Sequence, residues 1–328
     1  LGSAQYAEFK AQANALPHVA ARGVQVEEAE AFLDPKLRDL LPDPSHLLDM
    51  DTAVERIVEA INGGEKIGVF ADYDVDGACS ASLLVRFFSA LGRNLHVYVP
   101  DRIAEGYGPN TPALLKLKEQ GVSLVITVDC GTTAFAPLSD AADAGLDVLV
   151  IDHHVAEPRL PDAVAIVNPN RLDETSQVGQ LCAAGMVFML IIAVNRALRD
   201  AFWYDEGHGE PNLINMLDLV ALATVADVVP LTGVNRALVR QGLAVMSRRQ
   251  NPGIAALADV SRLDETPEAW HLGFMLGPRV NAGGRVGEAG LGVKLLTTTD
   301  VDEAAGIATR LDQYNSERRE IEAAVLEA

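Results

Sequence analysis

The sequence predicts an α/β protein in which helices flank a parallel, Rossmann-like sheet and a mainly helical subregion follows. Three observations support this prediction: apolar runs typical of strands, helical stretches that alternate with them, and the loss of that alternation after residue 180. Strands that are apolar along their whole length and separated by helices are typical of a parallel sheet covered on both faces.

The predicted elements follow one another in a regular order. The first fifty residues combine short helical patterns with Asp-Pro breaks, so residues 1–50 are expected to form a helical N-terminal segment. Apolar runs, mostly rich in β-branched residues, predict strands at 66–72, 95–99, 124–129 and 147–152. The remaining patterns predict helices at 51–61, 80–92, 110–121, 134–145, 181–198, 213–227, 235–249 and 302–328.

Composition narrows the class of protein. None of the apolar runs approaches the roughly 20 residues of a membrane-spanning helix, and the N-terminus shows no secretory signal. Three widely spaced cysteines, Cys79, Cys130 and Cys182, favour a reducing cytoplasm over a disulfide frame or a zinc site. The net charge of −20 argues against a nucleic-acid partner, although a protein with this net charge can still carry a local basic groove.

Acidic residues gather where the predicted strands end. Asp72, Asp74 and Asp76 follow the first strand at alternate positions, and Asp129 and Asp152 close two later strands. Because ligands of an open parallel sheet bind beyond the carboxyl ends of its strands, these carboxylates are expected at one edge. Carboxylates this close repel one another unless a cation lies among them. The pattern therefore predicts a metal site.

Two histidines and one further acid extend this set. His153 and His154 follow Asp152, and Asp227 follows an apolar run in the second half of the chain. Imidazole beside carboxylates suits Mn²⁺, Fe²⁺ or Zn²⁺ better than Ca²⁺. So many ligands exceed the needs of one ion, and two ions that share a carboxylate are expected. Gly77 is expected to let the chain turn tightly into the next helix.

Each motif also has a purely structural interpretation. An Asp-rich turn is often a helix cap or a solvated loop, and adjacent histidines are common on surfaces. The stretch DYDVDG resembles the start of a calcium loop, but the later glutamate of that pattern is missing. The coincidence of acidic ends on successive strands favours the metal interpretation.

Together the motifs resemble the DHH phosphoesterase superfamily. The stretches DYDVDG, VITVDCG, VIDHH and TVADVVPL stand in the order of its motifs. Three further segments, at 100–110, 181–188 and 277–289, resemble the RecJ branch of single-stranded-DNA exonucleases within that superfamily. The N-terminal stretch ARGVQVEEAEAFLDPKLRDLLPDP is also similar to that branch, so the resemblance runs from about residue 20 to the end. It implies the DHH phosphoesterase fold.

The resemblance implies roles for the motif residues. The implied metal ligands are Asp72, Asp74, Asp76, Asp129, His153 and Asp227. The implied catalytic residues are Asp74, Asp76, Asp129, Asp152, His153, His154 and Asp227. Asp129 would bridge the ions, whereas His153 and Asp227 would complete the shell of the second ion. His154 would face the bridging water or the scissile phosphate, and Asp152 would orient both histidines.

Substrate contacts are expected from a second group of residues, which comprises His154, Arg102, Tyr107, Arg279, Asn281 and Arg285. Guanidinium groups near a phosphate path can make bidentate contacts, and the ring of Tyr107 offers a surface for stacking a base. The glycine pair 283–284 would allow close approach of the backbone. A helix-capping loop with surface arginines and a buried structural tyrosine are the alternative interpretations.

The resemblance also implies domain bounds, and the sequence departs from the patterns of the superfamily in two ways. Residues 51–300 are expected to form the DHH catalytic domain, with its parallel part extending to about residue 180 and its mainly helical part after it. Residues 301–328 are expected to begin a connecting helix, with the C-terminal DHHA1 and OB-type domains of the family absent. Phe70 stands where the pyrophosphatase branch has a histidine, which would leave one ion more weakly bound.

The resemblance implies a hydrolase that uses two Mn²⁺ or Mg²⁺ ions and removes mononucleotides from single-stranded DNA in the 5′-to-3′ direction, in DNA repair and recombination. A cytoplasmic monomer without membrane contact is expected, with a single-strand-binding protein or a helicase as candidate partner. A phosphodiesterase for short oligoribonucleotides or cyclic dinucleotides is the first alternative. A catalytically silent scaffold that binds DNA or a partner is the second, and the retained metal motifs argue against it.

Overall fold

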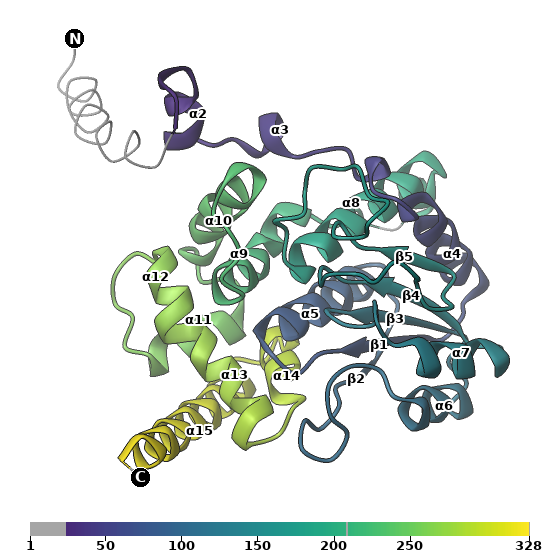
Figure 1. The fold of residues 1–328 in the computed structure, drawn as a ribbon. Coiled ribbons are helices and arrows are strands. Elements are labelled where there is room, and N and C mark those ends of the chain that lie inside the picture. The colour runs from purple at the N-terminus through teal and green to yellow at the C-terminus, as the bar shows by residue number, and fades with distance from the viewer. Residues whose placement is uncertain (1–23, 208, 328) are drawn as a thin grey trace.

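A single parallel sheet organises the first half of the chain (Figure 1). The computed structural model describes residues 24–207 and 209–327, and its five strands lie in the order β2-β1-β3-β4-β5. The strands are β1 Ile67–Ala71, β2 His96–Tyr98, β3 Leu124–Val128, β4 Asp147–Ile151 and β5 Ala165–Val167. The predicted class is confirmed, and each of the four predicted strands is present. The sequence patterns did not predict β5, which pairs over three residues only.

Helices cover both faces of this sheet. They are α4 Met50–Gly63, α5 Val75–Ala90 and α8 Ala183–Asp200 on one face, and α6 Thr111–Glu119 and α7 Phe135–Asp143 on the other. Ile126 packs in the first of these two layers, whereas its neighbour Val125 packs in the second. Both side chains are fully buried. Burial on both faces explains why the strands are apolar throughout.

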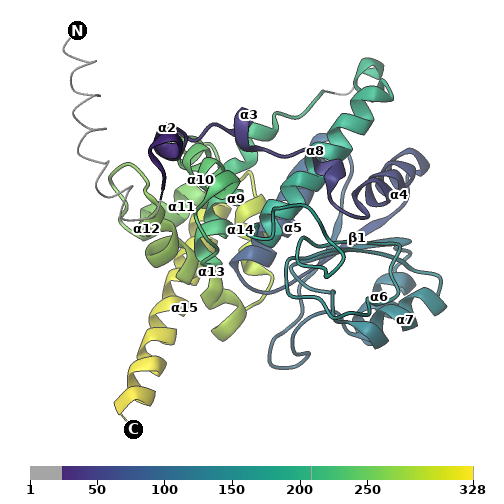
Figure 2. The same cartoon turned by 45° about the horizontal axis from the view of Figure 1, so that its top comes forward.

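The second half of the chain is helical and packs beside α5 (Figure 2). Its helices are α9 Leu217–Ala226, α10 Gly233–Met246, α11 Pro252–Val260, α12 Ala269–His271, α13 Gly277–Val286, α14 Leu291–Thr297 and α15 Val301–Glu327. Helix α9 contacts α5, α8 and α10, and α13 lies between α9 and α15. The segment GPRVNAGGR, which carries no clear helical pattern, therefore lies in helix α13.

Short elements complete the chain. They are η1 Val26–Glu28, α2 Ala29–Leu33, α3 Leu37–Leu40, η2 Pro44–His46, η3 Trp203–Glu206, η4 Leu213–Met216 and η5 Leu272–Leu276. Residues 1–23 of the predicted N-terminal segment 1–50 lie outside the described part of the chain. The prediction that the N-terminus carries no secretory signal concerns these same residues. No helix in the described ranges is long and apolar enough to cross a membrane.

The strand register aligns the residues that follow the strands. Ala71 pairs with Val128, and Val128 pairs with Ile151. The next residue on each of these strands therefore emerges at the same level of the carboxyl edge. In sheets of this order, the reversal of strand order between β1 and β3 opens a crevice for ligands. The fold thus places a candidate site at that edge.

Close packing of α9 against α10 yields a stability prediction. A Cβ at Gly242 would lie 2.2 Å from the Leu217 carbonyl oxygen and 2.4 Å from the Ala221 Cβ. Gly242→Ala should therefore lower the free energy of unfolding by about 1 to 3 kcal/mol, because two helix backbones must separate. The measurement is urea unfolding followed by circular dichroism.

Gly306→Ala is the matched control, since a Cβ at this exposed position in α15 meets nothing within 4 Å. That variant should gain about 0.5 to 1 kcal/mol from helix propensity alone. Equal stability of the two variants would contradict the packing described for α9 and α10.

Candidate active site

Three aspartates occupy the aligned positions at the carboxyl edge. The backbone N–H of Asp72 donates to the carbonyl of Val128, and that of Asp129 donates to the carbonyl of Ile151, so the ladder continues into them. Asp152 follows β4 in the same way, and all three side chains are buried. Asp129 has a φ of 61°, a left-handed conformation that non-glycine residues adopt rarely and that clusters at functional sites.

The start of α5 supplies two more carboxylates. Asp74 caps this helix, because its side chain accepts a hydrogen bond of 3.0 Å from the N–H of Gly77. The two oxygens of Asp76 accept hydrogen bonds of 2.7 and 2.8 Å from the backbone N–H groups of Ala183 and Ala184. These donors are the first residues of α8, whose N-terminus favours a negative charge. Asp76 thus joins α5 to α8.

Two glycines let backbones meet around this loop. A Cβ at Gly77 would lie 2.3 Å from the Asp72 carbonyl oxygen, so close approach of the backbone is the reason for glycine there. A Cβ at Gly284 in α13 would lie 2.5 Å from the Tyr73 carbonyl oxygen. The Asn281 side chain of the same helix accepts a hydrogen bond of 3.0 Å from the Val75 N–H. Helix α13 therefore holds the aspartate loop from the outside.

The two histidines have different surroundings. His154 places Nδ1 2.7 Å from Asp152 Oδ1, and the same oxygen accepts the backbone N–H groups of His153 and His154. His153 is largely buried, and its Nε2 lies 3.3 Å from Asp129 Oδ1 and 3.7 Å from oxygens of Asp76 and Asp227. Asp152 thus fixes the turn that aims both rings.

The side chains form three groups whose donor atoms lie within 4.8 Å of one another. The groups are Asp72, Asp74 and Asp129; Asp76, His153 and Asp227; and Asp129, His153 and His154. Two of their atoms, Asp72 Oδ1 and His153 Nε2, are buried without a hydrogen-bond partner. Buried polar atoms normally have partners, and a divalent cation would satisfy both. The donor set therefore fits two adjacent ions that share Asp129.

Burial and mutual repulsion raise the pKa of most of these carboxyl groups. Burial, then the charge of Asp74, raises the pKa of Asp72 to about 7, and the same causes raise that of Asp227 to about 6. Burial and neighbouring carboxylates also raise the pKa of Asp76 and Asp129. Protons or cations must compensate charge at this edge.

The pKa of Asp152, which is paired with His154, is lowered rather than raised. Burial would raise the pKa of Asp152, but hydrogen bonds with His154 and Thr132 outweigh it and hold the pKa at about 2. The hydrogen bond to Asp152 raises the pKa of His154. Burial, then the charge of His154, lowers the pKa of His153 and so favours its neutral imidazole.

A pocket of about 200 Å³ opens over these carboxylates. It is lined by Asp72, Tyr73, Asp74, Arg102, Tyr107, Asp129, His154, Asp227, Asn281 and Arg285. The Tyr107 hydroxyl donates to the Asp129 carbonyl at 3.1 Å, and the Arg102 guanidinium lies 5.3 Å from the Tyr73 ring centre. The structure thus brings five of the six predicted substrate contacts to one pocket.

The sixth predicted contact, Arg279, does not line this pocket. Its guanidinium donates to Asp312 of α15 at 2.8 Å and to the Met275 carbonyl at 2.7 Å. The bond to Asp312 ties α13 to α15. Phe70 is fully buried and stacks on Tyr98 with ring centres 5.4 Å apart. Cys79, Cys130 and Cys182 are free and buried.

Sequence reasoning missed two asparagines that follow β5. Asn168, fully buried, donates to the His154 carbonyl at 2.9 Å and to the Thr132 hydroxyl at 2.8 Å. Asn170 donates to the His153 carbonyl. The signal was the stretch AIVNPN, a short apolar run that ends on a polar residue, as three other strands do.

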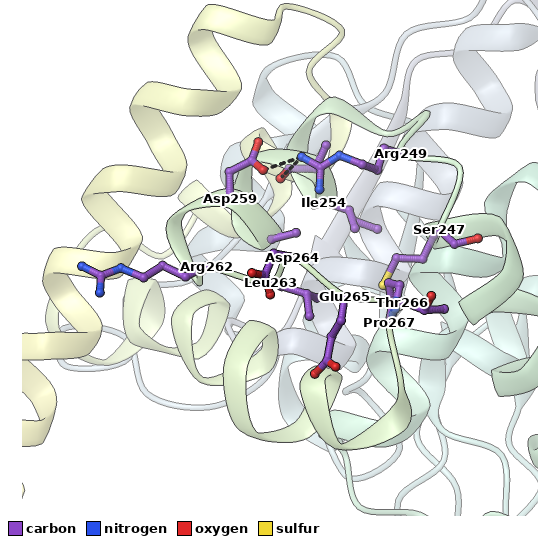
Figure 3. A pocket seen from close by; sticks show the side chains of 13 residues that line it. Ser247, Arg249, Ile254, Asp259, Arg262, Leu263, Asp264, Glu265, Thr266 and Pro267 are labelled. Carbon is purple, nitrogen blue, oxygen red and sulfur yellow. Dashed lines mark hydrogen bonds and ion pairs between the residues drawn. The ribbon is translucent and has the colours of Figure 1, made fainter.

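A larger cavity of about 630 Å³ lies in the helical half, between the end of α10 and α11 (Figure 3). On its rim Arg249 is paired with Asp259, whereas the Arg262 side chain points away from the other labelled groups. None of the metal-ligand groups found among the described residues lies there. The chemistry-bearing residues are thus concentrated at the sheet edge.

The fold and the site define a parallel α/β protein with a carboxylate–histidine cluster beyond its strand ends. Residues 66–224 match the DHH family, N-terminal domain. The single-stranded-DNA-specific exonuclease RecJ of Salmonella typhimurium is 41% identical over 307 residues, which are 92% of this chain and 52% of that protein. The chain thus spans about half the length of the curated relatives it matches.

Solved structures agree with this likeness. A crystal structure of exonuclease RecJ bound to manganese superposes with a TM-score of 0.77 at 34% identity, over 88% of this chain and 70% of that one. RecJ of Thermus thermophilus in complex with Mn²⁺ gives 0.77 at 32% identity over 94% of this chain and 42% of that one. The Mg²⁺ complex of the same protein gives a TM-score of 0.68 at 31% identity, over 94% of this chain and 39% of that one. The chain belongs to the RecJ family of DHH proteins.

The raised pKa values predict how stability of the metal-free protein varies with pH. Asp72 and Asp227 have an ordinary pKa of 3.8 when unfolded and about 7 and about 6 when folded, so the folded state holds their protons more tightly. Their contribution is complete below about pH 4 and is lost as the pH rises through 6 and 7. The melting temperature in EDTA should therefore fall between pH 5 and pH 8.

Asp72→Asn, which keeps the shape of the side chain without its charge, should flatten this decline. A melting temperature that rises across the interval in EDTA would contradict the electrostatic description of the site.

Proposed function

We propose that this chain hydrolyses phosphodiester bonds of single-stranded DNA, as a 5′-to-3′ exonuclease that acts with two divalent metal ions. The observation that supports it most is the meeting of two donor groups beneath a pocket with two arginines: Asp129 belongs to the group of Asp72 and Asp74 and lies 3.3 Å from His153 of the other group. The relatives named as single-stranded-DNA-specific exonucleases supply the substrate and the reaction in this proposal.

The donor groups suggest how the ions would be held. Asp72, Asp74 and Asp129 would hold one ion, and Asp76, His153 and Asp227 the other, with Asp129 between them. Mn²⁺ or Mg²⁺ is proposed because the solved RecJ structures hold these ions. Two such ions, when bound, activate water and stabilise charge on the attacked phosphate.

Residues around the pocket would position the substrate. Neither Arg102 nor Arg285 has an ion pair with another described residue, so both guanidinium groups can donate hydrogen bonds to phosphate oxygens. His154 is about half exposed and, with Nδ1 held by Asp152, would direct Nε2 toward the scissile phosphate. The exposed ring of Tyr107 would stack on a base.

The remaining expectations follow from the same placement. We propose residues 51–300 as the catalytic unit, because every proposed ligand and pocket-lining residue lies within them. We retain the role of residues 301–328 as a connecting helix, the monomeric state and a single-strand-binding protein or helicase partner as predictions. Three free cysteines accord with a reducing cytoplasm.

Digestion of end-labelled DNA tests the proposal. In Mn²⁺, the protein should release labelled mononucleotides at once from the 5′ end of a single strand and leave duplex DNA intact. Asp129→Asn should lower the rate at least about 1,000-fold, since it weakens the group shared by both ions, and losing about 4 kcal/mol of stabilisation has this effect. Asparagine tolerates the left-handed backbone of position 129, so the fold should persist.

A diribonucleotide and a Mn²⁺ titration complete that experiment. Faster cleavage of the diribonucleotide than of long single strands would replace the exonuclease by a small-substrate phosphodiesterase. Inactivity on every substrate together with no Mn²⁺ binding would favour the silent scaffold.

The arginines give a second prediction. Arg285→Ala should weaken binding of single-stranded DNA and reduce the slope of log Kd against log salt concentration by about 0.7 to 1, because one phosphate contact is lost. Arg279→Ala is the matched comparison, since this guanidinium is bonded to Asp312 and should affect stability more than binding. Fluorescence anisotropy at several salt concentrations measures both. Equal salt slopes for wild type and Arg285→Ala would rule out the assigned contact.

A further inference from the structure

Each member of the group Asp76, His153 and Asp227 is held on a different segment of the chain. His153 follows β4, Asp227 follows α9, and Asp76 is fixed by the first N–H groups of α8. These segments are far apart in sequence, so no local element sets their spacing. Tertiary contacts between the loops must set it.

One such contact is made by Asn170. Its Nδ2 donates to the carbonyl of His153 and, at 3.3 Å, to the carbonyl of Gly179. Its own N–H donates to Asn168 Oδ1 at 2.8 Å, which fixes the Asn170 backbone against β5. A Cβ at position 179 would lie 2.8 Å from Asn170 Oδ1, so a larger residue there would displace the Asn170 side chain. The His153 turn is thereby joined to residue 179.

A second contact is made by Asn235, near the start of α10. This side chain is fully buried, and its Nδ2 donates to the Gln180 carbonyl at 2.6 Å and to the Pro230 carbonyl at 3.0 Å. Pro230 lies three residues after Asp227, in the loop that leaves α9. The Asp227 loop is thereby joined to residue 180.

The two contacts meet at neighbouring residues. Gly179 and Gln180 are bonded by Asn170 from one side and by Asn235 from the other, and this segment leads directly into α8. The N–H groups of Ala183 and Ala184, three and four residues beyond Gln180, hold Asp76. We propose that Asn170 and Asn235 are positioning residues that act through Gly179–Gln180 to set the spacing of the Asp76–His153–Asp227 group for one metal ion.

The carboxamide suits this task for a chemical reason. One nitrogen carries two N–H donors in a fixed plane, so it can bond two carbonyl groups from different segments at once. Each asparagine uses both donors in this way. Aspartate has no donor when ionised, and alanine has none at all, so neither can replace the link.

The inference rests on the proposed function only in assigning this group to a metal ion, and a Mn²⁺ titration of the full chain by electron paramagnetic resonance tests it. The wild type should bind two ions. Asn235→Ala and Asn170→Ala should each weaken one of the two sites at least about 10-fold and leave the other unchanged. Because both act on one segment, the double variant should lose less affinity than the product of the single losses.

Asn195→Ala is the matched control. Asn195 is likewise buried, but it bonds Glu210 and Tyr204 near the far end of α8. This variant should lose melting temperature and keep both Mn²⁺ sites. If Asn235→Ala does not fold, it is replaced by Asn235→Ser, which retains one donor, and by Asn170→Ala. Both of these variants should show the same weakening of one Mn²⁺ site.

The outcomes separate the inference from the proposed function. Two Mn²⁺ sites of wild-type affinity in folded Asn170 and Asn235 variants would overturn the inference and leave the proposed function standing. No Mn²⁺ binding by the wild type would overturn both. In activity assays, the asparagine variants should lower kcat at saturating Mn²⁺ with an unchanged KM for single-stranded DNA, whereas an increase in KM alone would contradict a role at the ion.

Discussion

Repulsion between buried carboxylates is the constraint on which the rest of this structure depends. Asp72, Asp76, Asp129 and Asp152 are all buried at one edge, where water cannot screen their charges. The protein compensates two of them itself. Helix α8 offers N–H groups to Asp76, while Asp152 accepts hydrogen bonds from His154 and Thr132. Asp72, in contrast, keeps a buried Oδ1 that lacks a partner among the described residues, and this imbalance is the physical basis for proposing bound ions.

The helical half of the molecule gains its role from this constraint. Carboxylates that repel one another will separate unless the loops that carry them are held. Helix α13 holds the aspartate loop through Asn281 and the close approach at Gly284, and Asp227 follows the last residue of α9. The left-handed backbone of Asp129 shows that strain is tolerated at the point shared by the donor groups. The second half therefore completes and braces a site that the sheet begins.

Much of this arrangement could be predicted because it depends on periodicity. Apolar runs that end in Asp72, Asp129 and Asp152 predict both the parallel sheet and the alignment of the acids, since parallel strands share one carboxyl edge. The bracing contacts carry no such signal. Whether Arg279 bonds Asp312 or lines the pocket, and which carbonyls Asn235 reaches, depends on tertiary packing between segments distant in sequence. The short strand β5 was missed for another reason: no helix separates it from β4, so the alternation of strands and helices that marks the other strands does not extend to it.

The central claim is that the donor groups hold two ions that share Asp129. A crystal grown with Mn²⁺ and measured at the manganese absorption edge tests it directly. Two anomalous peaks are expected about 3.5 to 4 Å apart, one on either side of the Asp129 carboxylate, with His153 and Asp227 beside one of them. A single peak, or two peaks of which neither touches Asp129, would contradict it.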